Sequence, residues 1–375
     1  MKSVLFISSD GFPSKANPTY GIFTYEQAKA IDNHHVELVD LQTNFSNKIY
    51  SDKFDQIVIH RLLYTKFNLI KILKNLLYLS KLRKINKPSL IICSFLNLRN
   101  IVYSQFINTK KITIVHGSDA IVLSFFKKII FRKFLNKNYK IFTVSKFTKK
   151  TLINTFNSKS ITNKIIVAYN GISRNKLNLK DLNILKKVPN NKIIILCIAN
   201  LVPRKNIPYL IKVFKLLNLR NVNKYHLVIV GDGTERYKIQ NILEQENLKK
   251  NITILKSLTD SEVSSLFKKS KFFCLFSKLH KNQFEGFGIV FIEAMYKKSI
   301  VFASKHGGIK ELVHDNFNGF SYNLDNKNTY FKIIKKIETM TKNTQAQKRI
   351  ISNAYNFSLK FTWKKNINLI LNSSL

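Results

Sequence analysis

The sequence is short of cysteine, and the few cysteines present lie far apart. Only three occur in 375 residues, Cys93, Cys197 and Cys274, and each sits in an apolar run. This spacing excludes a disulfide framework and a cysteine-based zinc site, and it predicts buried free thiols in a reducing compartment. The eight histidines are likewise scattered without metal-ligand spacing. We therefore expect no metal centre built on these residues.

The sequence also lacks a long apolar run. No stretch of about 18 apolar residues occurs, so no transmembrane helix is expected. The apolar run at the N-terminus ends at Ser8 and predicts a first β-strand over 4–8, in place of a cleavable signal. The expected location is the cytoplasm, with peripheral attachment to the inner face of the cytoplasmic membrane as a further expectation.

Acidic residues are scarce: 21 Asp and Glu stand against 63 Lys and Arg, a formal net charge of +42. Such an excess indicates an anionic partner, such as a membrane surface, a nucleic acid or a phosphorylated substrate. The segments 64–84 and 121–140 mix basic with apolar residues, as helices that lie on an anionic bilayer do. Two alternatives stay open. A/T-rich codons can supply the lysine, and the apolar residues can instead pack on the sheet.

Expected strands and helices alternate along both halves of the chain. Strands are expected at 4–8, 35–40, 56–60, 90–94, 111–116, 140–145 and 165–169, and then at 193–199, 226–230, 251–255, 272–276 and 299–303. This alternation predicts an α/β protein with doubly wound parallel sheets. The length favours two domains, 1–180 and 181–356, with the linker in the polar stretch 173–192. No G-x-G-x-x-G follows a strand, so a dinucleotide-binding site is not supported.

Two carboxylates, Glu285 and Glu293, lie eight positions apart around an expected helix start. Gly286 and Gly288 make a continuous helix through Glu285 unfavourable, so Glu285 should lie in a loop and Glu293 inside a helix that begins near Gly288. The N-terminus of that helix offers unpaired N–H groups to phosphate or sugar oxygens. Taken alone, such a glutamate pair is also common by chance.

Two further motifs stand at the ends of expected strands. His116 opens the sequence His-Gly-Ser-Asp at a strand end, where open α/β sheets bind ligands. Its ring could bind a sugar or phosphate oxygen, or could cap the strand through structural hydrogen bonds. Arg204 and Lys205 lie in a strand-to-helix loop and suit a diphosphate, although a lone basic pair carries little weight in so lysine-rich a chain.

Taken in order, these motifs resemble the retaining glycosyltransferases of family 4. The resemblance extends from about residue 3 to residue 325, and it is most specific in the second half. The motifs that carry it are the Gly21 loop, His116-Gly-Ser-Asp, Tyr169-Asn-Gly-Ile, Pro203-Arg-Lys-Asn, Gly231-Asp-Gly-Thr-Glu-Arg, Glu285-Gly-Phe-Gly-(x)4-Glu293 and Gly307-Gly-Ile-Lys-Glu311.

The resemblance implies the GT-B fold, in which two Rossmann-like, doubly wound parallel-sheet domains face a central cleft. The first domain, 1–180, would bind the acceptor, and the second, 181–356, would bind a nucleotide-diphosphate sugar. A C-terminal helix, 357–375, would return to the first domain.

The resemblance also implies roles for single residues of the second domain. Lys205, with Arg204, would neutralise the diphosphate, and Glu293 would bind the ribose hydroxyls. The donor sugar would be held by Glu285 together with the backbone of Gly286, Phe287 and Gly288.

In the first domain, His116 would touch the transferring sugar, and Gly21 would bring its loop against the phosphates. One departure from the family's pattern is Asn200, which stands where an arginine often provides a second phosphate ligand. Arg204 would then take over that charge.

The chemistry that follows needs no metal or other cofactor besides the nucleotide sugar. Glycosyl transfer passes through an oxocarbenium-like state, and fixed cations can stabilise the diphosphate that leaves. No Asp-x-Asp motif occurs. The expected acceptor is a glycan that is linked to a lipid, in surface polysaccharide or lipopolysaccharide synthesis. The alternatives are a GT-B sugar-nucleotide epimerase and a non-catalytic basic protein that binds nucleic acid or membrane. No nucleic-acid-binding module is recognised, so we expect no nucleic-acid partner.

Overall fold

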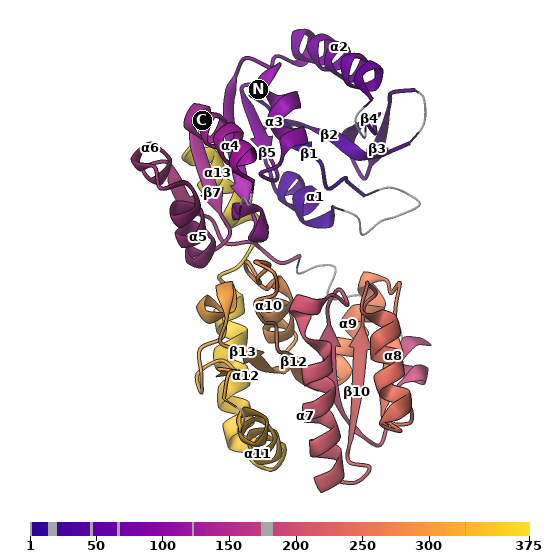
Figure 1. The fold of residues 1–375 in the computed structure, drawn as a ribbon. Coiled ribbons are helices and arrows are strands. Elements are labelled where there is room, and N and C mark those ends of the chain that lie inside the picture. The colour runs from indigo at the N-terminus through magenta and orange to yellow at the C-terminus, as the bar shows by residue number, and fades with distance from the viewer. Residues whose placement is uncertain are drawn as a thin grey trace. The chain divides into compact units, whose positions relative to one another are not determined.

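The protein is described by a computed structural model that covers residues 2–13, 21–45, 48–65, 68–121, 124–173, 183–326 and 328–375. The chain forms two compact units (Figure 1). Unit 1 contains Met1–Gly171 and Thr362–Leu375, and unit 2 contains Ile172–Phe361. The division falls beside the expected linker, of which residues 174–182 lie outside the described residues.

Within the described residues, unit 1 is built on an eight-stranded sheet with the strand order β3-β4-β2-β1-β5-β6-β7-β8. All its neighbouring strands run parallel except β3 and β4. The central strand β1 is buried over its whole length, as expected for a strand covered on both faces. The bounds are β1 Ser3–Ser8, β2 His35–Asn44, β3 Tyr50–Phe54, β4 Ile57–Leu63, β5 Leu90–Cys93, β6 Lys110–Val115, β7 Lys140–Thr143 and β8 Ile165–Val167.

The helices of unit 1 are α1 Ile22–Lys29, α2 Leu69–Asn86, α3 Leu98–Gln105, α4 Phe125–Lys137, α5 Lys146–Phe156, α6 Lys159–Thr162 and α13 Trp363–Asn372. The basic segment expected at 64–84 is helical only from Leu69, where the Asn68 side chain caps the first turn. Its residues Lys66 and Phe67 lie outside the described residues. The segment expected at 121–140 contains α4.

Unit 2 contains a six-stranded parallel sheet, again counted over the described residues, with the order β11-β10-β9-β12-β13-β14. Its strands are β9 Ile193–Ile198, β10 Tyr225–Val230, β11 Ile252–Leu255, β12 Ser270–Leu275, β13 Ile300–Ser304 and β14 Phe320–Tyr322. Its helices are α7 Ile207–Arg220, α8 Arg236–Gln245, α9 Asp260–Lys269, α10 Ile289–Tyr296, α11 Thr329–Lys342 and α12 Thr344–Ser358. Two parallel-sheet α/β domains are therefore present, as the sequence predicted.

The prediction of one continuous C-terminal helix over 357–375 is wrong. Helix α12 ends at Ser358, and α13 begins at Trp363, where the Thr362 side chain accepts a hydrogen bond from the Lys365 backbone N–H. This cap starts a new helix, and α13 packs on α1 inside unit 1. There Gln27 donates a buried hydrogen bond of 2.5 Å to Asn366.

The three cysteines are buried and unpaired, as the sequence predicted. Burial raises the pKa of Cys93 to about 11 and that of Cys197 to about 12, so neither is a reactive thiolate. Among the residues that the structure describes, no helix is both long and apolar enough to cross a membrane.

Candidate active site

The candidate residues of unit 2 follow two neighbouring strands at the point where the sheet reverses its order. Strand β9 lies between β10 and β12. After β9 the chain adds β10 and β11 on one side of it, and then crosses to add β12, β13 and β14 on the other side. Open α/β sheets bind ligands at the carboxyl ends of the strands at such a switch point. Arg204 and Lys205 follow β9 in a short 3-10 turn, and Glu285 follows β12.

Both cations make ion pairs with Glu285. Its Oε2 accepts a hydrogen bond of 2.9 Å from Arg204 and a second one from the Lys205 ammonium. Lys205 and Glu285 are buried, whereas the Arg204 side chain is 24% exposed. Two positive charges face one negative charge, which leaves a net positive site at the switch point.

Glu285 is ionised at neutral pH. Burial raises the pKa of this carboxyl, but the charges and hydrogen bonds of Lys205 and Arg204 outweigh burial and bring the pKa below its usual value. The site therefore holds a fixed carboxylate beside two fixed cations before any ligand enters.

A glycine turn holds the loop that carries Glu285. Gly308 donates a backbone hydrogen bond of 2.9 Å to the Glu285 carbonyl. A Cβ on Gly308 would lie 2.1 Å from the Gly286 carbonyl oxygen, and a Cβ on Gly307 would lie 2.5 Å from that of Glu285. Only glycine allows the two backbones to approach so closely.

The remainder of the predicted loop leads into α10. Gly288 has φ of 92° at the helix start, a left-handed conformation that favours glycine. The Phe287 side chain is buried and packs on Phe361, with ring centroids 5.9 Å apart. Phe287 thus anchors the loop through its side chain.

Glu293 lies on α10, and its side chain has no hydrogen-bond or ion-pair partner among the described residues. Burial, together with the nearby charge of Asp260, raises the pKa of Glu293 to about 7. An unpaired, partly buried carboxylate is suited to accept hydrogen bonds from hydroxyl groups of a ligand.

We expect Glu293→Gln to stabilise the unliganded protein at pH 8 but not at pH 4. The raised pKa means that the folded protein favours the protonated carboxyl. This contribution is present below the unfolded pKa, about 4.3, and is lost as the pH rises through about 7. The gain at pH 8 should be on the order of 1 kcal/mol. Thermal melts at both pH values measure it, with Glu246→Gln as an exposed control. Equal melting temperatures for Glu293→Gln and wild type at pH 8 would contradict the assigned pKa.

His116 directly follows β6 in unit 1, and its turn is organised by Asp119. The backbone N–H groups of His116 and Gly117 donate to the Asp119 carboxylate at 3.0 and 2.7 Å. The imidazole lies against the Phe95 ring with centroids 4.5 Å apart, and its Nε2 is buried without a hydrogen-bond partner in the described part of the chain.

Burial lowers the pKa of His116 to about 4, against the opposing effect of a hydrogen bond with the Ser94 backbone. The ring is therefore neutral at physiological pH, and the unpartnered Nε2 can exchange one hydrogen bond with a ligand. No role for Asp119 was predicted from the sequence. Aspartate is nevertheless common in turns, because its carboxylate can accept hydrogen bonds from nearby backbone N–H groups.

Gly21 begins α1 with φ of 60°. A Cβ at this position would lie 2.1 Å from the carbonyl oxygen of Gly11. The start of α1 is therefore pressed against the segment that follows β1, and glycine is required there for both reasons.

The structure brings together Arg204, Lys205 and Glu285, with Gly286, Phe287 and Gly288 in the same loop and Glu293 on the adjoining helix. His116 and Gly21 belong to unit 1. The ion pairs to Glu285 were not predicted, because they join residues about 80 positions apart. Asn200, where the family pattern often has an arginine, is exposed just after β9.

Known proteins resemble this chain in sequence and in fold. Residues 183–357 match the family model described as "Glycosyl transferases group 1". An uncharacterized glycosyltransferase of Methanocaldococcus jannaschii is 31% identical over 254 residues, which are 67% of this chain and 64% of that protein. The match thus spans less than two thirds of the relative's own length. A poly(ribitol-phosphate) alpha-N-acetylglucosaminyltransferase of Staphylococcus aureus is 34% identical over 134 residues, 35% of this chain and 25% of that protein.

Among solved structures, Anabaena HepE in complex with UDP and glucose superposes with a TM-score of 0.77. The alignment covers 100% of this chain and 99% of that one at 18% identity, a likeness that shows the fold. Residues 183–357 thus match the group 1 glycosyl transferases, and the two parallel-sheet units have the fold seen in GT-B glycosyltransferase structures.

Proposed function

We propose that the protein is a retaining glycosyltransferase of family 4 that moves a sugar from a nucleotide-diphosphate sugar to a glycan acceptor. The observation that carries this proposal is the cluster of Glu285, Lys205 and Arg204 at the switch point of unit 2, beside the unpaired Glu293. The cluster supplies fixed positive charge for a diphosphate and a carboxylate for ribose. The bound UDP in the HepE structure supports the same class of donor.

In this reaction the donor's bond to the diphosphate breaks, and negative charge develops on the leaving oxygen. Lys205 and Arg204 would stabilise that charge without reorganising, because Glu285 already holds both side chains. Glu293 would accept hydrogen bonds from the ribose hydroxyls. His116 would contact the transferring sugar through its neutral ring, and Gly21 would allow a close backbone approach to the phosphates. We assign no covalent nucleophile.

The test is a thermal-shift screen against nucleoside diphosphates and their sugars, followed by a product assay with the best donor in EDTA. A ligand that binds the native state at 100 times its Kd raises stability by about 2.7 kcal/mol. We expect one nucleotide to stabilise the protein, and transfer or slow donor hydrolysis to survive EDTA because no Asp-x-Asp motif occurs. A new nucleotide sugar as product would instead identify an epimerase. The absence of any nucleotide-dependent shift would contradict the proposal.

We further propose a lipid-linked acceptor that is met at an anionic membrane, in surface polysaccharide or lipopolysaccharide synthesis. On α2, Leu69, Ile70, Leu73 and Leu77 are between 60% and 74% exposed. Leu79 and Leu82 of the same helix are buried. The sheet therefore covers only part of the apolar surface of α2, which leaves an apolar face among lysines. Helix α4 likewise exposes Phe125 and Phe126. Exposed apolar side chains between basic ones are the composition of helices that lie in a bilayer interface.

We expect the protein to co-sediment with anionic vesicles at low salt and to be released as salt rises. Changing Lys127, Lys128, Arg132 and Lys133 of α4 to Gln should abolish binding, because each cation near such a surface contributes about 1 kcal/mol. A matched variant changes the exposed Lys332, Lys335, Lys348 and Arg349 of unit 2 to Gln and should still bind. Equal loss in both variants would mean that total charge, not α4, governs association. If the protein bound neutral and anionic vesicles equally, electrostatic attraction would not contribute to its membrane binding.

A further inference from the structure

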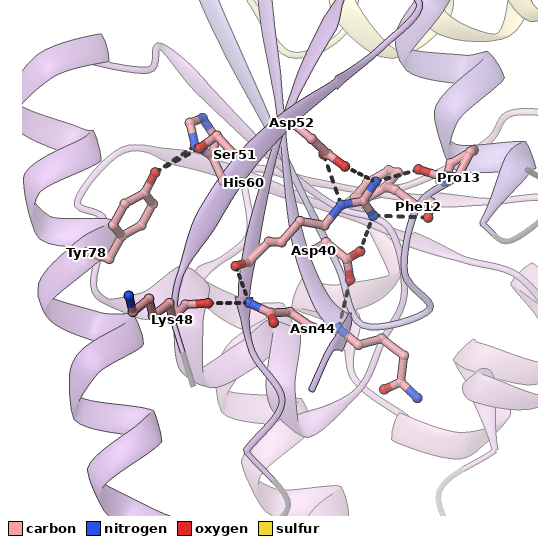
Figure 2. Close-up of polar contacts among 11 residues, drawn as sticks. Phe12, Pro13, Asp40, Asn44, Lys48, Ser51, Asp52, His60 and Tyr78 are labelled. Atoms are coloured by element: carbon pink, nitrogen blue, oxygen red, sulfur yellow. Dashed lines mark hydrogen bonds and ion pairs between the residues drawn. The ribbon is translucent and has the colours of Figure 1, made fainter. Parts of the chain in front are cut away.

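Arg61 is a buried cation of unit 1 and is not one of the candidate site residues. It stands on β4 directly opposite Asp40 of β2, and the two side chains are 1% and 0% exposed. One terminal nitrogen of Arg61 donates to Asp40 at 2.5 Å, and Nε donates to Asp52 of β3 at 3.1 Å. Figure 2 shows these carboxylates on two sides of the guanidinium.

Two further hydrogen bonds of Arg61 go to backbone carbonyls. The terminal nitrogens donate to the carbonyl oxygens of Phe12 at 3.1 Å and Pro13 at 2.5 Å (Figure 2). With a second bond to Asp52 at 3.3 Å, these contacts within the described residues amount to five hydrogen bonds, as many as a guanidinium has N–H groups. A lysine ammonium has three donors on one atom and cannot reproduce this fork.

Sheet stability alone does not account for this arrangement. Transfer of an ion pair from water into a protein interior is costly, and apolar side chains of similar volume often stabilise a fold equally well or better. The contacts that apolar side chains could not replace are those to the carbonyls of Phe12 and Pro13. These carbonyls lie outside any strand or helix.

The held segment is in contact with Gly21. Residues 11–13 follow β1, and the Gly11 carbonyl meets the start of α1 so closely that a Cβ on Gly21 would lie 2.1 Å away. A continuous series of contacts therefore runs from Arg61 through Phe12 and Pro13 to Gly11, and from there to Gly21.

We propose that Arg61 is a positioning residue for glycosyl transfer, which fixes the segment after β1 and thereby the N-terminus of α1 at Gly21. This inference rests on the proposed function, in which Gly21 approaches the donor phosphates. Arg61 itself touches no reacting atom; it acts through the backbone of residues 11–13.

The experiment compares Arg61→Lys with a matched control, Glu37→Gln. Glu37 is also buried on β2 and accepts from His60 of β4 at 3.1 Å, one residue before Arg61, but it has no contact with residues 11–13 among the contacts of the described chain. Asp52→Asn is a second, milder variant, because Asp52 is 38% exposed and binds the guanidinium from its outer side. All variants are assayed well below their melting temperatures.

Three quantities are measured: hydrogen exchange of peptides covering residues 9–13, UDP affinity, and kcat and KM for UDP-glucose hydrolysis or for the donor found in the screen. For Arg61→Lys we expect faster exchange in 9–13 and a kcat about tenfold lower, with KM and UDP affinity within twofold of wild type. Asp52→Asn should change in the same direction by less. Glu37→Gln should lower the melting temperature without these effects.

Unchanged exchange in Arg61→Lys, or an equal loss of kcat in Glu37→Gln, would overturn the inference. Wild-type protein that binds no nucleotide at all would instead overturn the proposed function, and the exchange measurement would still show whether Arg61 holds the segment.

Discussion

Glu285→Gln is expected to lower the rate of sugar transfer on the order of 100-fold while the protein stays folded. The carboxylate holds Arg204 at 2.9 Å and also binds Lys205. A neutral amide keeps the shape of the side chain but removes the charge that fixes both cations. The cations then lose the arrangement that stabilises the leaving diphosphate.

The same variant should bind the free nucleoside diphosphate about tenfold more tightly than wild type. Glu285 no longer neutralises the two cations, and charges at an effective dielectric constant near 20 still attract a diphosphate appreciably. We would measure the transfer rate by turnover, the nucleotide affinity by calorimetry, and the folded state by circular dichroism. Glu246→Gln removes an exposed carboxylate and serves as the control. If Glu285→Gln keeps near-wild-type turnover with a folded spectrum, the assignment of the site is wrong.

Lys205→Ala is expected to reduce transfer by a similar factor, on the order of 100-fold, and in addition to weaken nucleotide binding. Lys205 is 8% exposed, so its ammonium would meet the diphosphate with little water between them. Its loss also leaves Glu285 with Arg204 alone. Lys205→Arg keeps the charge and should recover part of the activity.

Lys205→Ala should also change how stability depends on pH. In wild type the lowered pKa of Glu285 provides stability above the unfolded pKa of a glutamate, about 4.3, and this stability is lost as the pH falls through the folded pKa. Without Lys205 the pKa rises, so the stability gained between pH 3 and pH 6 shrinks. Melting temperatures across this range and donor titrations measure both effects. A variant with wild-type nucleotide affinity would show that Lys205 does not meet the diphosphate.

The fold was predictable where apolar runs and glycine boundaries were strong. The strands at 4–8 and 193–199 and the helix from 207 were predicted to within one or two residues. Strand β3 was missed, because three of its five residues, Ser51, Asp52 and Lys53, form a continuous polar run at the edge of the sheet. The hairpin that joins it to β4 turns at Asp55, which takes φ of 52° without a glycine to mark it. Helix α3 was also missed; its only local mark is the cap at Asn97.

For the candidate site, the local pattern placed Glu285 in a loop and Glu293 inside a helix, because Gly288 marks the helix start. The contacts between distant segments had no local pattern. The ion pair of Lys205 with Glu285 and the clamp of Gly307 and Gly308 on residues 285–286 depend on the order of strands in the sheet. The hydrogen bonds of Arg61 to Phe12 and Pro13 depend on the pairing of β2 with β4.

The position of α13 sets an order in which the chain can complete its domains during synthesis. Unit 2 is one continuous segment, Ile172–Phe361, whereas unit 1 needs residues from both sides of it. The partner of the buried Gln27 amide is Asn366, which the ribosome adds 339 positions later. Unit 2 can therefore fold as it emerges, while the surface of α1 that receives α13 stays exposed until Thr362 and the residues after it have left the exit tunnel. A chain that stalls before this point would display that surface to chaperones and proteases.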